Sequence, residues 1–339
     1  MPPVSDGSPI DIHTHILPAA IPDFRSRFGY GEFITLEIDG ERATMLKGGS
    51  FFREVDRRLF DPQARLASCD ESGIGTQVLS TVPVMFSYWT EPRHGAEVAA
   101  FLNDDLAATV AANPDRFVAL GTLPMQDTDL AVSELERCMS QLDIAGVEIG
   151  TNVEQANLNE ARLFPIFEAA ADLGAAVFVH PWDMMGQEVM PDYWLPWLVG
   201  MPAETSRAIC SMMFGGVFER LPRLRVAFAH GGGSFPATFD RIQHGFDALP
   251  DYVGVDNHTP PSEYLGRFWL DSMVHSPSSL RSIADLVGTD KVCLGSDYPF
   301  RLGEAAPGTT IRAAGFGGET EAALLTTNAR AWLGEPSDV

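Results

Sequence analysis

Two histidines near the N-terminus, His13 and His15, are separated by one residue and end a short apolar run. The run, Ile10 to Ile12, follows polar and turn-forming residues and is typical of a first β-strand. Side chains two residues apart on a strand point to the same face, so both imidazoles would project together from its C-terminal end. Such a pair can hold one metal ion, although an isolated His-x-His is more often a surface or core feature.

Three further residues of metal-binding type follow strand-like runs. His180 comes directly after Ala175–Val179, and His230 directly after Leu224–Ala229. Asp297 lies just beyond the last such run. If these strands form a parallel barrel, their C-terminal ends meet at one mouth, where barrel enzymes place their catalytic groups. One histidine at a strand end is usually structural, but the whole set predicts a metal site.

Imidazole nitrogens and a carboxylate oxygen are ligands that suit zinc. Three or four protein ligands with one open position indicate a catalytic site rather than a closed structural one. Zinc lowers the pKa of water to near 7, and His230 could then act as a general base, because a free imidazole titrates in that range. Glycines 231–233 would let backbone N–H groups approach a ligand, and Ser234 is a candidate N-cap of the next helix. We interpret the remaining histidines as surface or packing residues: His94, His244, His258 and His275.

The elements that must position these residues alternate along the chain. We expect eight strands, at Ile10–Ile12, Gly75–Val82, Phe117–Leu123, Ile144–Gly150, Ala175–Val179, Leu224–Ala229, Phe268–Met273 and Lys291–Leu294. Periodic or alanine-rich stretches between and after them predict helices, at Pro62–Glu71, Gly95–Asn113, Thr128–Leu142, Glu160–Leu173, Pro202–Arg220, Ser234–Leu249, Pro277–Leu286 and Glu319–Leu333. This alternation favours an α/β protein with a closed (β/α)8 TIM-type barrel. A doubly wound open sheet is the alternative, weakened because no Gly-x-Gly-x-x-Gly and no phosphate loop is present.

The connection after the first strand is unusually long. Connections of this length are usually functional or carry small elements of their own. Within it, Phe33–Ile38 is strand-like and Gly48-Gly49 predicts a turn. We interpret residues 18–60 as a small insertion cap over the barrel mouth, within a single barrel domain over residues 1–339. An insertion that serves only stability is the alternative.

The composition bounds the kinds of partner. The 339 residues are 45% hydrophobic, enough for a large core, and carry a formal net charge of -23. Such a protein is a poor partner for nucleic acid or an anionic membrane surface, so a site for anions must be built locally from arginines. The four scattered cysteines indicate a reduced, intracellular chain, and their spacing excludes a zinc ribbon. With no signal peptide and no apolar run of about 18 residues, we expect a cytoplasmic protein.

Several longer stretches carry a specific resemblance: His180–Gly186, Trp194–Thr205, His230–Phe235, Pro260–Tyr264 and Gly295–Phe300. Together with Asp11–His15, they resemble the amidohydrolase superfamily and, within it, the 2-amino-3-carboxymuconate-6-semialdehyde decarboxylase family. The resemblance runs from Ile10 to about Trp332. The stretches Asp11–His15 and Gly295–Asp297 are shared with other decarboxylases of the superfamily. Residues 180–185 and 194–205 are much more specific.

The resemblance implies a zinc-dependent decarboxylase of tryptophan or nitrobenzoate catabolism. It would convert 2-amino-3-carboxymuconate 6-semialdehyde, the ring-cleavage product of 3-hydroxyanthranilate, into 2-aminomuconate 6-semialdehyde. One Zn²⁺ per subunit, or another divalent transition metal, would be held by His13, His15, His180 and Asp297. His230 would be the acid/base beside the bound water, and Asp297 would share in catalysis.

The same resemblance implies how a small dicarboxylate substrate is bound. Arg53 and Lys47 of the cap would face its carboxylates, and the pocket would be lined by Trp182, Met184, Trp194 and Phe300. Arg241 lies two turns into the helix after His230, about 10 Å along its axis, which is far from its own metal. The resemblance places it in the pocket of a homodimer partner.

Other functions stay open at this point. A related carboxymuconate semialdehyde or a hydroxybenzoate could be the substrate, because the pocket decides this. A zinc hydrolase of a lactone or amide would use the same metal but would not need Lys47, Arg53 and Arg241. A non-catalytic binding protein is disfavoured by the complete ligand set. For decarboxylation itself, either water addition to the conjugated system or an enol of the metal-bound substrate would supply the electron sink.

Overall fold

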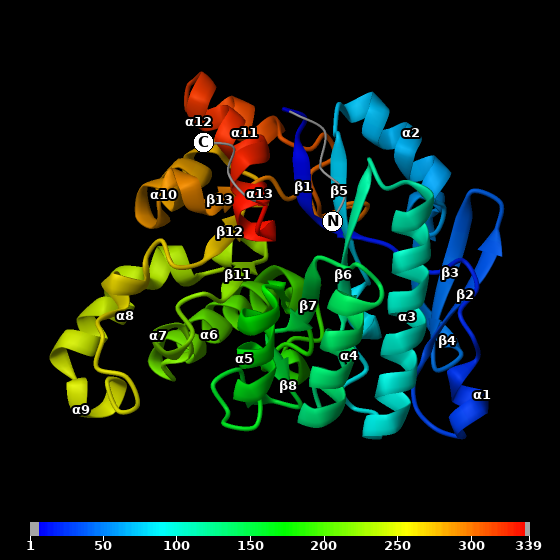
Figure 1. Cartoon of the computed structure of the whole chain (residues 1–339), viewed down its shortest axis with the longest axis horizontal. Coiled ribbons are helices and arrows are strands. Elements are labelled where there is room, and N and C mark those ends of the chain that lie inside the picture. Colours follow the sequence, from blue (N-terminus) through cyan, green and yellow to red (C-terminus); the bar gives the residue numbers. More distant parts are fainter. Residues whose placement is uncertain (1–6, 336–339) are drawn as a thin grey trace.

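The computed structural model describes residues 7–335, and its centre is one parallel sheet of eight strands (Figure 1). The strands are β1 (Ile10–His15), β5 (Thr76–Ser80), β6 (Phe117–Thr122), β7 (Gly146–Gly150), β10 (Ala176–His180), β11 (Arg225–Phe228), β12 (Trp269–Asp271) and β13 (Val292–Cys293). They pair in parallel and in this order.

The ring is closed by contacts between its first strand and the segment that follows its last. The backbone N–H of Ile12 donates to the carbonyl of Leu294 (2.9 Å), and that of His15 donates to the carbonyl of Tyr298 (2.7 Å). The predicted (β/α)8 TIM-type barrel is therefore confirmed. Nearly every strand residue is buried, as expected for strands covered on both faces.

Helices cover the outside of the barrel: α2 (Pro62–Ser72), α3 (Pro92–Ala112), α4 (Thr128–Ser140), α5 (Phe164–Leu173), α6 (Met201–Phe214), α7 (Val217–Arg220), α8 (Phe235–Ala248), α9 (Pro250–Val253), α10 (Pro277–Val287), α11 (Thr309–Ala314), α12 (Gly318–Ala322) and α13 (Asn328–Leu333). The helix predicted at 202–220 is divided, because Gly216 adopts a left-handed φ of 68° between α6 and α7. Short 3-10 helices cover Arg57–Leu59, Pro83–Met85, Gln187–Val189, His230–Gly232, Pro261–Tyr264 and Thr289–Lys291, and π-helical turns cover Pro196–Gly200 and Ala323–Thr327.

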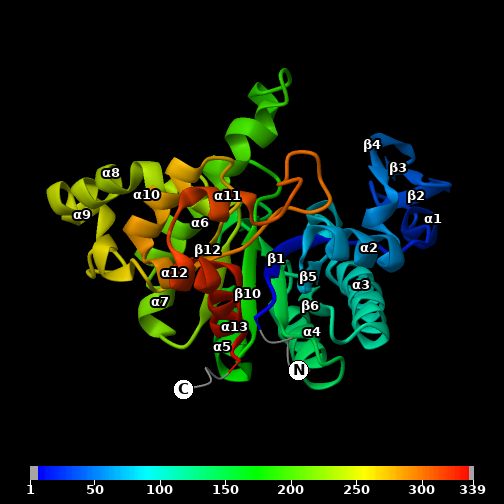
Figure 2. The ribbon, with the colours of Figure 1, turned by 90° about the horizontal axis from the view of Figure 1, so that it is seen from above.

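Between β1 and α2 the chain forms helix α1 (Phe24–Phe28) and a separate antiparallel sheet, β2 (Ile34–Asp39), β3 (Arg42–Lys47) and β4 (Ser50–Asp56). The predicted turn at Gly48-Gly49 joins β3 to β4, with φ values of 60° and 84°. Buried side chains of this insertion, such as Phe33 and Met45, pack with Val84 after β5 and Leu102 of α3. Figure 2 shows the small sheet beside the strand ends of the barrel.

A second short antiparallel pair, β8 (Asn152–Val153) and β9 (Ala156–Asn157), follows β7. The segment between β10 and α6, residues 181–200, extends beyond the body of the barrel and is the green projection in Figure 2. It carries several exposed hydrophobic side chains, among them Val189 (76% exposed) and Tyr193 (86% exposed).

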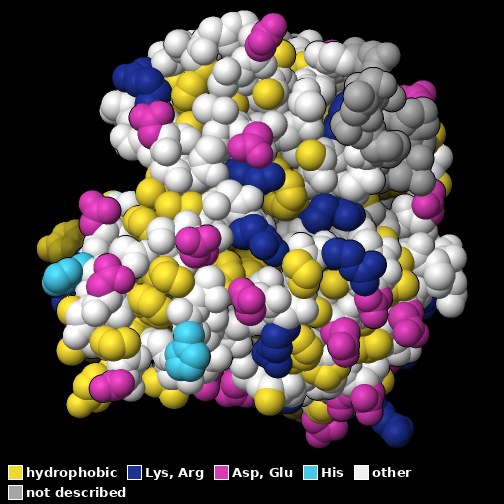
Figure 3. All heavy atoms as spheres, turned by 60° about the vertical axis from the view of Figure 1, so that its left-hand side comes forward, with side chains coloured by type: hydrophobic (Ala, Val, Ile, Leu, Met, Phe, Trp, Pro, Cys, Tyr) yellow, Lys and Arg dark blue, Asp and Glu magenta, His cyan; other side chains and the backbone are white. Residues whose placement is uncertain are grey.

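None of the helices within residues 7–335 has the length and apolar character that crossing a membrane requires. Figure 3 shows a face on which acidic, basic and hydrophobic side chains alternate, so on that face the acidic excess is not gathered in one patch. The absence of a signal peptide is a prediction about the N-terminal stretch. Residues 1–6 of that stretch lie outside the described residues.

Candidate active site

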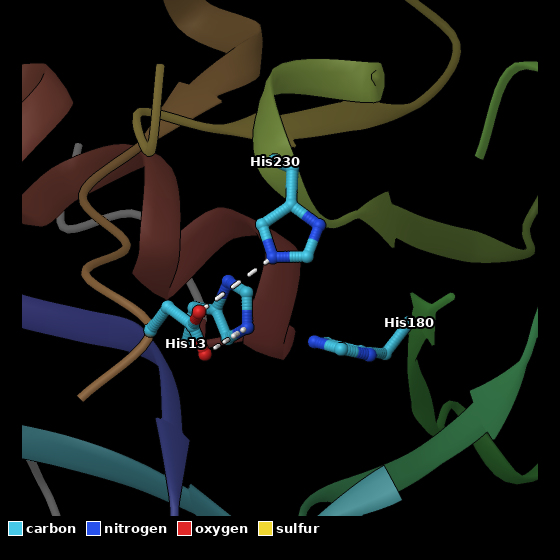
Figure 4. Close-up of side chains that lie close together, drawn as sticks. His13, His180 and His230 are labelled. Carbon is cyan, nitrogen blue, oxygen red and sulfur yellow. Dashed lines mark ion pairs between the residues drawn. The ribbon is translucent and has the colours of Figure 1, made fainter. Parts of the chain in front are cut away.

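Five side chains meet at the C-terminal mouth of the barrel. His13 and His15 come from β1, His180 ends β10, His230 lies two residues beyond β11, and Asp297 follows β13. Ring centroids of neighbouring imidazoles are 5.0 or 5.1 Å apart. Three of these imidazoles approach one common centre from different strands (Figure 4). The convergence follows from the parallel barrel, which gathers all strand ends at one mouth.

The hydrogen bonds of the Nδ1 atoms of His15 and His180 determine whether their Nε2 atoms carry a proton. His15 Nδ1 lies 2.8 Å from the carbonyl of Thr81, and His180 Nδ1 lies 3.0 Å from the carbonyl of Pro181. A carbonyl only accepts, so each Nδ1 carries the proton and each neutral ring turns an unprotonated Nε2 inward. Burial holds the pKa of His180 well below its usual value, with the neighbouring histidines His15 and His13 adding to this, so its ring stays neutral.

These inner nitrogens fit a cation. His180 Nε2 is buried without a hydrogen-bond partner in the described structure, and the Nε2 atoms of His13 and His15 lie only 3.2 Å apart. Lone pairs that face each other in a buried site are unfavourable unless a positive charge lies between them. Asp297 supplies a carboxylate 3.3 Å from His15 Nε2. One ligand atom each from His13, His180, His230 and Asp297 also lies within 4.8 Å of the others.

The carboxylate of Asp297 is negatively charged in this setting. Burial alone would raise the pKa of Asp297, but the neighbouring imidazoles of His15, His230 and His13 outweigh it and hold that pKa well below its usual value. His230 Nε2 lies 3.8 Å from the second carboxylate oxygen, Oδ2. The site thus offers the imidazoles of His13, His15 and His180, the carboxylate of Asp297 and, beside them, the imidazole of His230. This donor set suits a divalent transition metal.

Asp271, at the end of β12, supports two of the five residues at once. Its Oδ2 lies 2.6 Å from His13 Nδ1 and accepts the backbone N–H of His230 (2.9 Å), while Oδ1 accepts that of Gly231 (2.7 Å). Burial would raise the pKa of Asp271, but the hydrogen bond with His13 and the backbone N–H group of Gly231 help to bring it below its usual value. The carboxylate thereby fixes the His13 tautomer and the position of the His230 backbone.

The Asp271→Asn variant is expected to bind the metal about 10- to 100-fold more weakly, the usual effect of losing a carboxylate that orients a histidine ligand. Equilibrium titration against a metal-competing chelator measures this affinity. Asp251→Asn, an exposed residue of α9, is the matched control. Equal affinities in the two variants would show that Asp271 does not orient His13.

The backbone around the site is tightly packed and locally strained. A Cβ on Gly295 would lie 2.6 Å from Asp271 Cβ and 3.0 Å from His13 Cβ, so only glycine allows the strands to approach here. His230 and Asp297 adopt left-handed φ values of 56° and 57°, which non-glycine residues rarely do outside functional sites. Ser234 occupies the N-cap position of α8, as the sequence predicts, but its side chain makes no capping hydrogen bond. Its hydroxyl donates instead to the carbonyl of Pro202 (3.2 Å).

A cavity of about 880 Å³ opens above the cluster and is bounded by the small sheet, the 181–200 segment and the turn after β13. Arg53 of β4 lies on its wall, and its Cζ is 5.1, 5.6 and 5.9 Å from the ring centroids of Phe300, Phe52 and Trp197. No carboxylate in residues 7–335 lies within ion-pair distance of its guanidinium. Arg53 is thus held among aromatic rings in the cavity that contains the imidazole cluster.

The other residues singled out from the sequence lie at different distances from this cavity. Trp182, Trp194 and Phe300 line it. Met184 is buried beneath the lining, against Gly200. Lys47 lies on β3 with its Nζ 3.4 Å from Glu32, and Arg241 is exposed on α8, outside the lining.

Sequence reasoning missed Asp271, Glu148 and Trp197. Asp271 and Glu148 lie inside two predicted strands, near their C-terminal ends, where the same rule that found His180 would have marked them. Glu148 Oε1 is 3.8 Å from His15 Nδ1, and burial raises the Glu148 pKa well above its usual value. Trp197, in a π-helical turn, carried no sequence signal of its own.

Comparisons with known proteins agree with this geometry. The amidohydrolase family matches residues 10–334. The 2-amino-3-carboxymuconate-6-semialdehyde decarboxylase of Dictyostelium discoideum is 51% identical over 327 residues, which cover 96% of this chain and 91% of that protein.

Solved structures add two neighbours. The 5-carboxyvanillate decarboxylase of Sphingomonas paucimobilis superposes with a TM-score of 0.76 at 30% identity, covering 81% of this chain and 84% of its own. A dihydroxybenzoic acid decarboxylase of Polaromonas, solved with bound manganese and the inhibitor 2-nitroresorcinol, shares the fold with a TM-score of 0.77 at 21% identity and covers 96% of both chains.

Proposed function

The chain belongs to the amidohydrolase superfamily and, within it, to the 2-amino-3-carboxymuconate-6-semialdehyde decarboxylase family, and from this premise we propose its substrate and metal. It is a decarboxylase that acts without oxidation. We propose that it converts 2-amino-3-carboxymuconate 6-semialdehyde into 2-aminomuconate 6-semialdehyde and CO₂, with zinc, in the breakdown of tryptophan or nitrobenzoate in the cytoplasm.

One observation carries this proposal: the unpaired guanidinium of Arg53 lies on the wall of the cavity that contains the imidazole cluster. The substrate is a conjugated dicarboxylate, with one carboxylate to be lost and another to be held. A guanidinium is well suited to bind a carboxylate through two parallel hydrogen bonds. Hydrolysis of a neutral lactone or amide would leave this half-buried cation without a function.

The metal ligands that we propose are His13, His15, His180 and Asp297. When bound, a divalent ion would act as a Lewis acid and lower the pKa of water at the site. Zinc is our first choice because of the three imidazoles, and manganese, which the Polaromonas neighbour holds, is the alternative.

The chain's own residues would do the rest. Arg53 holds the carboxylate that remains, and the rings of Trp182, Trp194 and Phe300 exclude water from the conjugated chain of the substrate. The bond between carbon and the departing carboxylate breaks, and its electron pair passes into the conjugated system. His230, half-buried beside the cluster, moves the proton that the carbon receives. Lys47 and Met184, farther from the cavity surface, would support the pocket wall.

The decisive experiment is an assay of the purified, zinc-loaded protein with the freshly prepared ring-cleavage product of 3-hydroxyanthranilate. We expect the absorbance of the substrate to disappear with release of one CO₂ per molecule. 2,6-Dihydroxybenzoate and 5-carboxyvanillate, tested in parallel, represent the hydroxybenzoate alternative. Turnover of either in preference to the muconate compound would contradict the proposed substrate.

We further propose a homodimer in which Arg241 binds substrate in the partner's cavity. Arg241 is exposed on α8 and does not line the cavity of its own chain. It is therefore free to enter the cavity of a second copy and complete the site there. A two-fold interface would make this exchange mutual.

The Arg53→Ala and Arg241→Ala variants are each expected to be nearly inactive, since each removes one carboxylate partner from every site. Unfolded and refolded together, the two variants should recover about one quarter of the wild-type activity, because about half the dimers are mixed and each has one intact site of two. Arg27→Ala, an exposed residue of α1 that pairs with Glu97, is the matched control for Arg53→Ala. Mixed dimers without recovered activity would show that Arg241 does not serve the partner's cavity.

A further inference from the structure

The lining of the active-site cavity differs in charge from the protein as a whole. Four arginines and four carboxylates line it, so the lining is balanced while the chain carries a net charge of -23. The arginines are Arg42, Arg53, Arg58 and Arg301, and the carboxylates are Glu54, Asp56, Asp297 and Glu304. The net negative charge of the protein opposes the approach of an anion, so a lining of balanced charge is a more favourable place for one.

Two of the four arginines already have carboxylate partners. Arg58 makes two hydrogen bonds to Asp56 (2.9 and 2.6 Å), and Arg42 lies 3.9 Å from Glu54. The carboxylate of Glu304 accepts backbone N–H groups around the start of α11, at 2.9 and 2.6 Å. These groups are therefore engaged within the protein.

Arg53 and Arg301 are the two that remain. Within the described part of the chain, no carboxylate lies within ion-pair distance of either guanidinium. Arg53 is half-buried and lies against the ring of Phe300, whereas Arg301, the next residue after Phe300, is exposed at the outer part of the same lining. One unpaired cation thus lies inside the cavity and a second lies nearer its mouth.

Arg301 is carried by a well-anchored turn. The backbone N–H of Phe300 donates to the carbonyl of Asp297 (3.0 Å), that of Gly303 to Phe300 (3.0 Å), and that of Glu304 to Ser296 (2.8 Å). A Cβ on Gly303 would lie 2.4 Å from the carbonyl oxygen of Ser296, so the turn is packed as closely as glycine allows. The backbone that carries Arg301 is therefore fixed relative to Asp297.

We propose that Arg301 is an outer docking residue that captures dicarboxylate substrates at the cavity mouth before Arg53 binds them. This inference rests on the proposed function, because it assumes a dianionic substrate. An exposed guanidinium attracts a dianion more strongly than a monoanion, so this residue favours entry of the dicarboxylate over its singly charged product. It contributes to capture and not to the chemical step.

The test compares steady-state kinetics of Arg301→Ala, Arg301→Lys and Arg301→Glu in the zinc-loaded enzyme. At low ionic strength we expect Arg301→Ala to raise KM about three- to tenfold with kcat within about twofold, because a rim charge acts mainly on association. Arg301→Glu should raise KM further, and Arg301→Lys should restore it. At about 0.5 M salt the variants should converge, since screening then shortens electrostatic reach to a few ångströms.

Arg223→Ala is the matched control. Arg223 is 76% exposed, pairs with Asp172 (2.9 Å) and lies just before β11, at the end of the barrel opposite the mouth. The variant changes the net charge by the same amount without touching the cavity. If Arg301→Ala has the same KM as Arg223→Ala at low ionic strength, Arg301 is not a docking residue.

A binding assay separates this inference from the proposed function. trans,trans-Muconate and sorbate have similar conjugated chains, but muconate carries two carboxylates and sorbate carries one. Quenching of the fluorescence of the cavity tryptophans measures the binding of each. We expect Arg301→Ala to weaken muconate several-fold more than sorbate. That result in a protein that does not decarboxylate the proposed substrate would reject the function but retain the docking residue. Decarboxylation with no effect of Arg301→Ala in either assay would retain the function and reject the docking residue.

Discussion

The His180→Ala variant is expected to lose both its stoichiometric metal and its decarboxylase activity while it keeps a folded barrel. His180 Nε2 is buried without a partner in the described structure, and its ring points toward those of the other labelled histidines (Figure 4). Its removal opens the donor set and leaves a small cavity, which costs about 1–3 kcal/mol of stability, less than a domain of this size provides. Metal content by elemental analysis, circular dichroism and turnover measure the three quantities.

His258→Ala provides the control, because His258 is an exposed histidine far along the chain from any candidate ligand. It should retain full metal and activity. Full zinc content in His180→Ala would contradict the ligand assignment, whatever happens to turnover.

The His230→Asn variant is expected to keep near-normal metal content and to lose turnover by at least about 10²-fold, the usual contribution of a general acid or base. The His230 backbone N–H, not its side chain, bonds to Asp271, so the substitution leaves that support in place. His230→Ala should behave in the same way. Metal content and kcat, measured on the same preparation, distinguish a proton carrier from a ligand.

This distinction matters because a ring nitrogen of His230 lies with the ligand atoms of His13, His180 and Asp297. Loss of metal in both His230 variants would make His230 a ligand. Activity within a few-fold of the wild type would instead show that no imidazole is needed at this position.

The barrel could be predicted from the sequence because parallel strands are buried on both faces and therefore appear as continuous apolar runs. Each run found in the sequence overlaps a strand, and the residues after the runs, such as His180 and His230, lie at the mouth for the same reason. The strand lengths differ from those expected: β13 has two residues, whereas the sequence predicts four at Lys291–Leu294. Its place in the ring depends on hydrogen bonds to β1, which no local pattern contains.

The parts of the site that could not be predicted depend on contacts between distant segments. Asp271 supports His13 across 258 positions of sequence, and Trp197 lines the cavity from the segment between β10 and α6, whose path no local pattern contains. The pairing state of each arginine is likewise a property of the folded chain. The family resemblance identified Arg53 as a substrate-binding residue. Arg301 can be recognised as a candidate only in the structure, where Arg42 and Arg58 have carboxylate partners and Arg301 has none among the described residues.

The closure of the ring also orders events during protein synthesis. Ile12 and His15 bond to Leu294 and Tyr298, and Ser296 donates both its N–H and its hydroxyl to Asp11. A nascent chain that has emerged only as far as α10 already holds the four histidines of the site but neither Asp297 nor the carbonyl groups of Leu294 and Tyr298 that bond to β1. The complete set of proposed ligands therefore exists only after Asp297 has been synthesised, and truncated products released before that point cannot form the whole proposed metal site.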